Sequence, residues 1–148
     1  MIRLLVLFQL TFVVVFSCKC STVSPRDTFC QAKWVSHVKV MDKRTSSDRS
    51  TVVYTVEHID VYKNMTDPLG TEIVTPESSA ACGVTDLKTG KEYLLAGTVA
   101  NGSELRIVSC LFFNVKDDPT PIIGALAFEK VAEDLRSKLE AADFGGCP

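Results

Sequence analysis

Alternation of apolar and polar positions predicts that the middle of this chain is built from β-strands. Two segments rich in Val, Thr and Tyr, residues 34–41 and 51–61, flank the polar stretch 42–50 and predict a long hairpin. Further strands are expected at residues 71–74, 92–99 and 104–115. The last two are joined through Asn101-Gly102, a dipeptide typical of tight hairpin turns.

The period of the pattern changes after residue 119 and predicts a C-terminal helix. Thr120 is placed to cap this helix, with Pro121 at its first position. Apolar residues then fall on one face at helical spacing: Phe128, Val131, Leu135, Leu139 and Ala142. Gly145-Gly146 is expected to end the helix, so that Cys147 can tie the tail back to the sheet. Five strands and one helix favour a mainly β fold, a small closed five-stranded Greek-key barrel of the OB type, over a doubly wound sheet.

The first 17 residues have the pattern of a secretory signal peptide. Arg3 gives a positive charge near the start, residues 4–16 are apolar at all but two positions, and Val15 and Ser17 stand at the small-residue positions before a cleavage site. The apolar run is short for a bilayer span, and no later segment approaches the roughly 20 apolar residues that a membrane helix needs. We therefore expect residues 1–17 to be removed and residues 18–148 to form one domain, secreted into the extracellular space or matrix. A bacterial lipoprotein signal with an acylated Cys18 is the alternative, and it would leave five cysteines to pair.

Charge and cysteine content narrow the possible partners. The chain carries 16 Lys and Arg against 18 Asp and Glu and has no dense basic run, which argues against nucleic acid, heparin or an anionic membrane as the main partner. Six cysteines in a secreted chain indicate three disulfides, for which fifteen pairings are possible: Cys18, Cys20, Cys30, Cys82, Cys110 and Cys147. Because residues two apart in an extended segment cannot easily bridge to each other, Cys18 and Cys20 are expected to reach separate partners. Their spacings do not suggest a zinc site of the chain's own.

Catalytic motifs are missing from the sequence. It has no H-E-x-x-H, no G-x-S-x-G and no phosphate-binding glycine loop. His37 and His58 fall in expected strands and are interpreted as surface or barrel-end residues rather than catalytic bases. We therefore do not expect an enzyme.

An ordered set of short motifs resembles the N-terminal domain of the tissue inhibitors of metalloproteinases. The motifs are Cys18-x-Cys20, Pro25, Phe29-Cys30, Ser79-Ala80-Ala81-Cys82-Gly83-Val84, Gly90-Lys91-Glu92-Tyr93-Leu94-Leu95-Ala96-Gly97, Cys110 and Cys147. The resemblance covers essentially the whole of residues 18–148 and implies a single netrin-like domain without the second, C-terminal domain of vertebrate members. It also implies the disulfides Cys18–Cys82, Cys20–Cys110 and Cys30–Cys147.

The resemblance further implies a secreted inhibitor of zinc metalloproteases of the matrix, adamalysin-like or astacin-like classes, acting as a monomer. Cys18 would be the first residue after cleavage, and its free amine and carbonyl oxygen would chelate the zinc of the target protease. The zinc belongs to the target, and no cofactor of the chain's own is implied. The other inhibitory positions implied are Lys19, Cys20, Ser21, Ser79, Ala80 and Ala81.

Two positions depart from the family pattern. Where Lys19 stands, inhibitory members usually have Thr or Ser, whose side chain enters the pocket beyond the scissile bond; a lysine there favours a deep or acidic pocket. The segment Ser24-Pro25-Arg26-Asp27 differs from the usual His-Pro-Gln motif.

A netrin-like module that binds matrix or signalling proteins, with inhibition lost, is the alternative function. Asn64-Met65-Thr66 and Asn101-Gly102-Ser103 are possible glycosylation acceptors with either function.

Overall fold

The computed structural model describes residues 18–114 and 124–148. The expected signal peptide and the expected helix cap at Thr120-Pro121 lie outside these ranges. Within the described residues, no helix is both long and apolar enough to cross a membrane.

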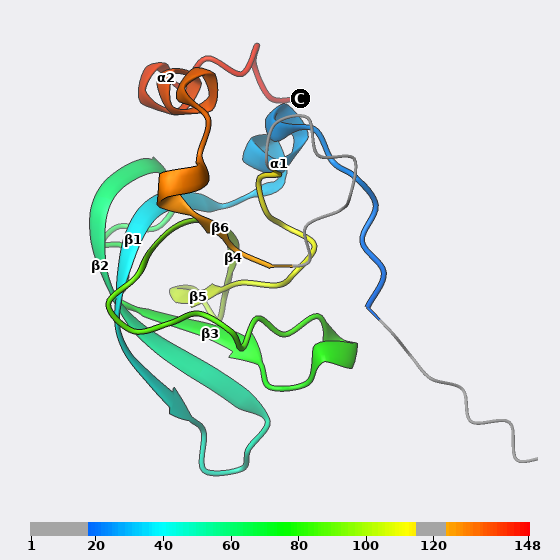
Figure 1. Cartoon of the computed structure of the whole chain (residues 1–148), viewed down its shortest axis with the longest axis vertical. Helices are drawn as coiled ribbons and strands as arrows, with labels where there is room; N and C mark the ends of the chain where they lie inside the picture. Colours follow the sequence, from blue (N-terminus) through cyan, green and yellow to red (C-terminus); the bar gives the residue numbers. More distant parts are fainter. Residues whose placement is uncertain (1–17, 115–123) are drawn as a thin grey trace, which may run out of the picture.

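Six strands form one sheet that closes into a barrel (Figure 1). They are β1 (Trp34–Thr45), β2 (Thr51–Asn64), β3 (Glu72–Pro76), β4 (Glu92–Ala100), β5 (Glu104–Arg106) and β6 (Leu126–Ala127). The sheet order is β1-β2-β3-β5-β4-β6, and a further pairing of β1 with β4 closes a ring of five strands. Only β3 and β5 pair in parallel. The predicted five-stranded barrel is therefore confirmed, and β6 is an additional short strand on β4.

The predicted hairpins are present, and the strands of the first are longer than the sequence pattern suggested. β1 continues to Thr45 and β2 to Asn64, and the two stay paired through three shifts of register that let the long strands bend around the barrel. Asn101 and Gly102 have φ values of 49° and 83°, the left-handed conformation that a tight turn between β4 and β5 requires.

The apolar residues form two clusters on either side of the barrel wall. One fills the barrel around Trp34, Tyr54 and Leu95. The other lies outside it, where Leu94 and Phe113 pack beneath the two helices. Successive β4 residues therefore serve different clusters. Gly97 of β4 has no alternative to glycine, because a Cβ there would collide with the Trp34 ring and with the Arg106 carbonyl.

The strand predicted at residues 104–115 is wrong for residues 107–114, and residue 115 lies outside the described ranges. Residues 107–114 are irregular but contain the buried apolar residues Ile107, Leu111, Phe112 and Phe113. Their backbone leaves β4 for other partners: the Ile107 N–H donates to the Val74 carbonyl and the Ser109 N–H to the Cys82 carbonyl. The apolar run correctly indicates that this segment is buried. It does not indicate the path of the backbone, which has to bring Cys110 to its disulfide partner.

The C-terminal helix is confirmed, but its start was predicted too early. The chain first adds β6 to β4, then makes a 3-10 turn, η2 (Phe128–Lys130), and only then forms helix α2 (Glu133–Ala141). Leu135 and Leu139 are buried on one face as predicted. Phe128 and Val131 are not part of this helix, because Leu126 pairs with Leu94 of the sheet and Val131 is extended. Ala142 is the left-handed cap of α2 and is exposed.

Candidate functional site

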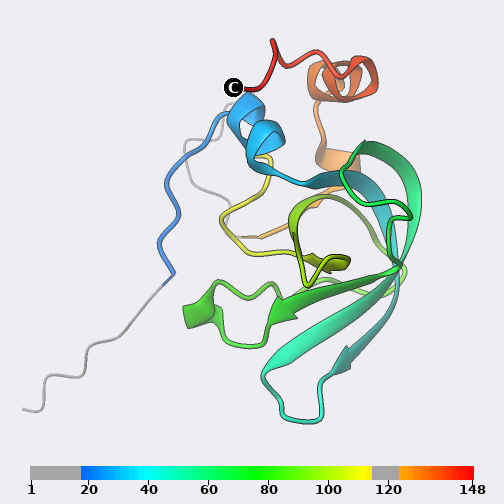
Figure 2. The ribbon, with the colours of Figure 1, turned by 180° about the vertical axis from the view of Figure 1, so that it is seen from behind.

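Two disulfides fix the segment that follows the expected cleavage site. Cys18 is bonded to Cys82 and Cys20 to Cys110, while Cys30 is bonded to Cys147 near the other end of the chain. These are the pairs that the family resemblance implies. Cys18 and Cys20 reach separate partners, as expected. Residues 18–24, which contain both cysteines and lead to the first helix, have no regular secondary structure (Figures 1 and 2).

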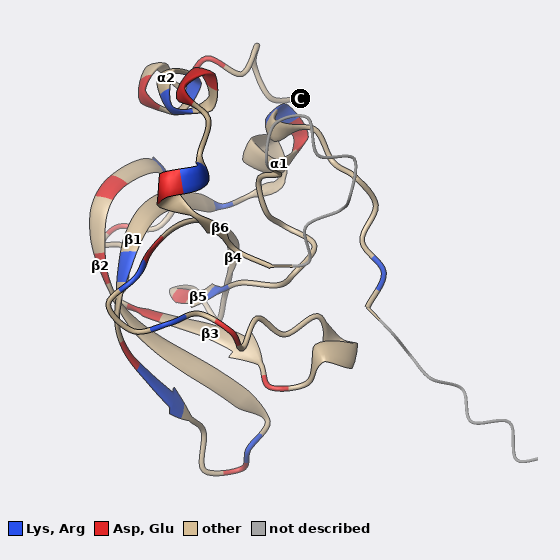
Figure 3. Cartoon of the chain, in the orientation of Figure 1, with Lys and Arg blue, Asp and Glu red and all other residues tan. Residues whose placement is uncertain are grey.

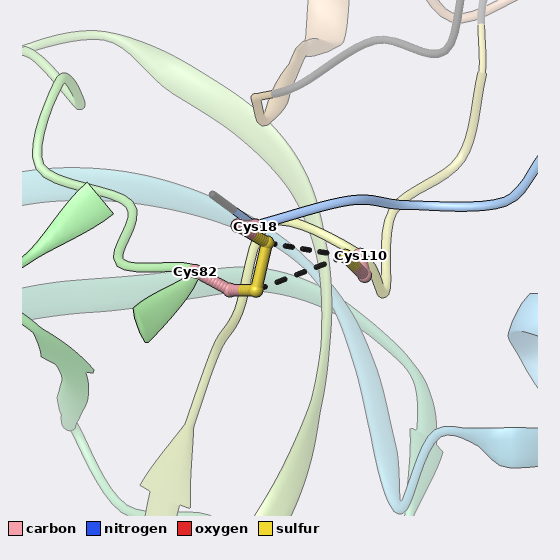
Figure 4. Close-up of side chains that lie close together, drawn as sticks. All are labelled: Cys18, Cys82 and Cys110. Atoms are coloured by element: carbon pink, nitrogen blue, oxygen red, sulfur yellow. Dashed lines mark hydrogen bonds between the residues drawn. A yellow bond between two sulfur atoms is a disulfide. The ribbon is translucent and has the colours of Figure 1, made fainter. Parts of the chain in front are cut away.

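The two bridges lie against each other. The Cys18 and Cys110 sulfur atoms, which belong to different bridges, are 3.5 Å apart, and those of Cys82 and Cys110 are 3.9 Å apart (Figure 4). Three sulfur atoms so close could suggest a metal site. None of the six cysteines is free, however, so no thiolate is present to bind a metal, and this cluster serves to hold the backbone.

Cys82 belongs to a rigid turn that carries three of the expected inhibitory residues. A 3-10 helix, η1 (Ser79–Ala81), is capped by the Ser78 hydroxyl, which accepts from the Ala80 N–H at 3.2 Å. The Ser78 carbonyl also accepts from the Ala81 and Gly83 N–H groups. The Cys82 N–H donates to the Ser79 carbonyl, so the four backbone N–H groups of residues 80–83 are all paired within the turn.

Buried side chains anchor this turn to the barrel through Val84. The Val84 N–H donates to the Thr75 hydroxyl oxygen at 2.9 Å, and the Val84 carbonyl accepts from the Tyr54 hydroxyl at 2.9 Å. Burial raises the pKa of Tyr54 to about 12, so its hydroxyl keeps its proton and remains a donor. A Cβ on Gly83 would collide with the Pro76 carbonyl, which explains the glycine of the Ala-Cys-Gly-Val motif.

The other face of the turn is tied to the irregular segment that contains Cys110. The Ser109 hydroxyl donates to the Cys82 carbonyl at 3.0 Å, and the Ser109 N–H donates to the same oxygen at 2.9 Å. These bonds join the turn that contains Cys82 to the segment that contains Cys110, so the disulfide partners of Cys18 and Cys20 are held together.

Five of the seven residues expected to contact a protease are exposed. The Cys18–Cys82 bridge brings Cys18 next to η1, whose residues Ser79, Ala80 and Ala81 are all exposed. Lys19 and Ser21 are exposed, and Cys18 and Cys20 are half-buried. Lys19 is the single charged residue among these seven. In Figure 3, η1 is entirely uncharged, and basic colour is present on the segment that leads to α1.

The residues after this segment start a helix that the sequence analysis missed. In α1 (Pro25–Gln31), Ser24 is the N-cap, its hydroxyl oxygen accepts from the Asp27 N–H at 3.1 Å, and Pro25 is at the first position. Arg26 donates from Nε to the Phe144 carbonyl at 2.9 Å and from Nη2 to the Gly146 carbonyl at 2.8 Å. The residues at Ser24-Pro25-Arg26-Asp27 that differ from the family motif thus have a structural role. The pattern Ser-Pro-x-Asp is typical of a helix start and could have revealed α1.

Both histidines have structural partners. His37, which was expected at the surface or at a barrel end, is buried, with Nε2 2.9 Å from a Glu92 carboxylate oxygen and its ring centroid 3.4 Å from that of Phe128. His58 is half-buried, with Nδ1 2.8 Å from the Ser36 hydroxyl and Nε2 2.9 Å from the Gly70 carbonyl oxygen. The Ser36 hydroxyl beside His58 is fully buried and also donates to the Asp60 carbonyl, which indicates a structural role for this pair.

The sequence motifs supplied the exposed residues of the candidate site, and the residues that support them were missed. Ser78, Thr75, Tyr54 and Ser109 each hold the turn through a hydrogen bond to its backbone. Nothing in a single sequence marks a strand threonine or tyrosine for such a role. Ser78 alone carried a signal, since serine before a short helix is a typical cap.

Comparison with known proteins identifies the family. The family model described as tissue inhibitor of metalloproteinase matches residues 16–122. A Caenorhabditis elegans protein named "Putative metalloproteinase inhibitor tag-225" is 35% identical over 150 residues, which cover 93% of this chain and 94% of that protein. Metalloproteinase inhibitor 2 of Oryctolagus cuniculus is 31% identical over 104 residues, and that of Homo sapiens 32% identical over 105 residues.

These alignments differ in extent. The rabbit match covers 64% of this chain and 53% of the rabbit protein, and the human match covers 65% and 47%. The chain thus spans about half the length of these mammalian relatives. All of these relatives are named as inhibitors of metalloproteinases and not as enzymes. On the family match and the similarity to the nematode protein, this chain belongs to the tissue inhibitor of metalloproteinase family.

Proposed function

We propose that this protein is a secreted, monomeric inhibitor of zinc metalloproteases that acts through Cys18. Residues 1–17 are removed as a signal peptide, so that residues 18–148 form the mature domain and the Cys18 amine becomes its free terminus. That amine and the Cys18 carbonyl oxygen then bind the catalytic zinc of the target at its open coordination position.

One observation carries this proposal: the Cys18 backbone is held by a disulfide beside an exposed turn of small residues. The Cys18–Cys82 bridge links it to η1, and the neighbouring Cys20–Cys110 bridge fixes the chain two residues later. A ligand that is already ordered loses little conformational entropy when it binds, which favours tight association. Ser79, Ala80 and Ala81 carry little side-chain bulk, which suits close approach of their backbone to a protease cleft.

The chain's own contribution is to present the amine and carbonyl in a fixed orientation and to supply contacts on both sides of them. An α-amine binds metal only after it loses its proton, and it titrates close to neutral pH, so this loss is inexpensive under extracellular conditions. On one side lies η1, and on the other Lys19 would enter the pocket beyond the scissile bond. A buried ammonium needs an opposite charge, so an acidic or deep pocket suits Lys19 better than an apolar one.

The test changes the terminus and leaves the barrel intact. N-terminal sequencing of the secreted protein should begin at Cys18. Adding one alanine before Cys18, or acetylating its amine, should weaken inhibition of matrix, adamalysin-like and astacin-like proteases by orders of magnitude, because a few central contacts dominate most interfaces. An alanine added after Pro148 is the matched control and should leave inhibition unchanged.

The same titration separates the alternative function. An extended or acetylated protein that inhibits as well as the native one would contradict chelation by Cys18. A native protein with the Cys18 terminus that inhibits no protease in the panel would instead favour a netrin-like binding module.

A further inference from the structure

A possible glycosylation acceptor, Asn64-Met65-Thr66, stands at the end of β2 with its side chains already arranged. Asn64 is exposed, and its Oδ1 accepts from the Thr66 N–H at 2.8 Å and from the Thr66 hydroxyl at 3.1 Å. The side-chain nitrogen of Asn64 is therefore not needed for this turn. At the second acceptor, Asn101 has its own structural explanation, because it occupies the left-handed position of the β4–β5 turn.

Large apolar side chains are exposed beside Asn64. Four are exposed in the described part of the chain, and three of these lie within residues 59–65. They are Ile59 at 43%, Val61 at 47% and Met65 at 61% exposure. Single exposed apolar residues are common, but three within seven residues are a local concentration that requires an explanation, and we refer to them as the apolar patch of β2.

The same segment lies at an incompletely covered strand edge. β3 pairs with β2 only at residues 51–55, and two further contacts to the loop before β3 extend this cover to His58. Beyond that point, β2 is paired through Asn64 with β1 on its other side. An edge strand with apolar side chains is a template for pairing with another molecule.

We propose that Asn64 is N-glycosylated and that its glycan shields this patch at the edge of β2. Val61 is about 10 Å from Asn64 along an extended strand, within the span of a few sugar residues. The proposal requires passage through the secretory pathway and so rests on that part of the proposed function. It does not depend on protease inhibition.

The modification is a substitution at the first sugar. The Asn64 Nδ2 forms a bond to the anomeric carbon of an N-acetylglucosamine, supplied by a lipid-diphosphate-linked oligosaccharide. The bond from that carbon to the diphosphate breaks, the diphosphate leaves with the electron pair, and the amide nitrogen loses one proton.

The position of Asn64 keeps a glycan away from the inhibitory surface. The C-terminal end of β2 and the loop after it lie on one side of the barrel, and segment 18–24 with η1 lies on the opposite side, in both views (Figures 1 and 2). Glycosylation and protease binding should therefore be independent.

The experiment expresses the full chain in eukaryotic secretory cells and compares native protein with Thr66→Ala and Thr66→Ser. Thr66→Ala abolishes the acceptor and leaves Asn64 in place, whereas Thr66→Ser keeps both the acceptor and a hydroxyl. Peptide mass mapping should find a glycan on Asn64 in the native and Thr66→Ser proteins and none in Thr66→Ala. Sedimentation velocity should show a several-fold larger associated fraction for Thr66→Ala, with inhibition constants equal in all three.

Two results would overturn the proposal: an unmodified Asn64 in the secreted native protein, or a Thr66→Ala protein that stays as dispersed as native. A further comparison treats native and Thr66→Ala protein with a mannose-directed endoglycosidase, which leaves one sugar on Asn64. It tests whether the longer glycan is the cause of the lower associated fraction of native protein. Loss of inhibition in every form, with the glycan present, would contradict the proposed function and leave this inference standing.

Discussion

Thr75→Val isolates the hydrogen bond that anchors the Cys82 turn. Thr75 is fully buried, and its hydroxyl oxygen accepts from the Val84 N–H at 2.9 Å. Valine has nearly the same shape and no oxygen, so the substitution leaves a buried N–H without a partner. Such a group costs about 1–3 kcal/mol, which for a domain of this size lowers the melting temperature by roughly 3 to 15 °C.

The effect should be local before it is global. In Thr75→Val, the Val84 amide should exchange its hydrogen faster than in native protein, and inhibition should weaken because the turn that holds Cys82 is looser. Thr75→Ser is the matched control: it loses a methyl group, at about 0.8 kcal/mol, and keeps the hydroxyl and the Val84 protection. Hydrogen exchange followed by mass spectrometry measures the protection of the Val84 amide. Thermal unfolding followed by circular dichroism measures the melting temperature. Equal Val84 protection in the valine and serine variants would refute the anchoring role.

Two further predictions concern charge. Lys19→Thr should strengthen inhibition of proteases with apolar pockets about tenfold, or ~1.4 kcal/mol, by removing a desolvation cost, and should not help against acidic pockets; inhibition constants that stay unchanged across the panel would place Lys19 outside any pocket. In the β1–β2 turn, hydrogen bonds from Ser46 and Ser50 lower the pKa of Asp48 to about 2 from its ordinary 3.8, so its carboxylate supports the turn above pH 4 and this support is lost as the pH falls toward 2. Exchange of the Ser50 amide should accelerate over that range in native protein relative to Asp48→Asn, after correction for the intrinsic pH dependence, and parallel profiles would contradict the assignment.

The sequence was most informative where one physical demand dominates. The long alternation around Val52, Tyr54 and Val56 could only be a strand with one face in a core. Asn101-Gly102 needs a left-handed turn, and the structure has one. At such positions the local sequence pattern and the tertiary environment favour the same backbone conformation.

Prediction failed where a local pattern is compatible with several structures. The apolar run through Phe112 and Phe113 has the composition of a strand, but the position of Cys110 and the hydrogen bond from Ser109 to Cys82 take it out of the sheet. Leu126 falls within the range expected for the C-terminal helix and instead pairs with Leu94 of β4. These outcomes depend on partners more than 25 residues away, which no local window contains.

For the candidate site, the sequence indicated the residues that face outward and could not indicate what holds them. The exposed residues form part of recognisable motifs around Cys18 and Cys82. Thr75 and Tyr54 come from β3 and β2, and their role exists only because the barrel brings both strands to Val84.

The proximity of the two N-terminal bridges has a consequence for how the protein acquires its covalent structure. Four cysteines converge on one small region, and the Cys18 sulfur lies 3.5 Å from that of Cys110, to which it is not bonded. A nascent chain that has collapsed around this region can therefore join the wrong partners with little backbone movement. Distance alone does not select Cys82 for Cys18; the selection must come from the finished turn at residues 78–84. The order of events in biosynthesis should thus be barrel first and correct bridges second, with disulfide-exchange catalysts needed to convert early mispaired species.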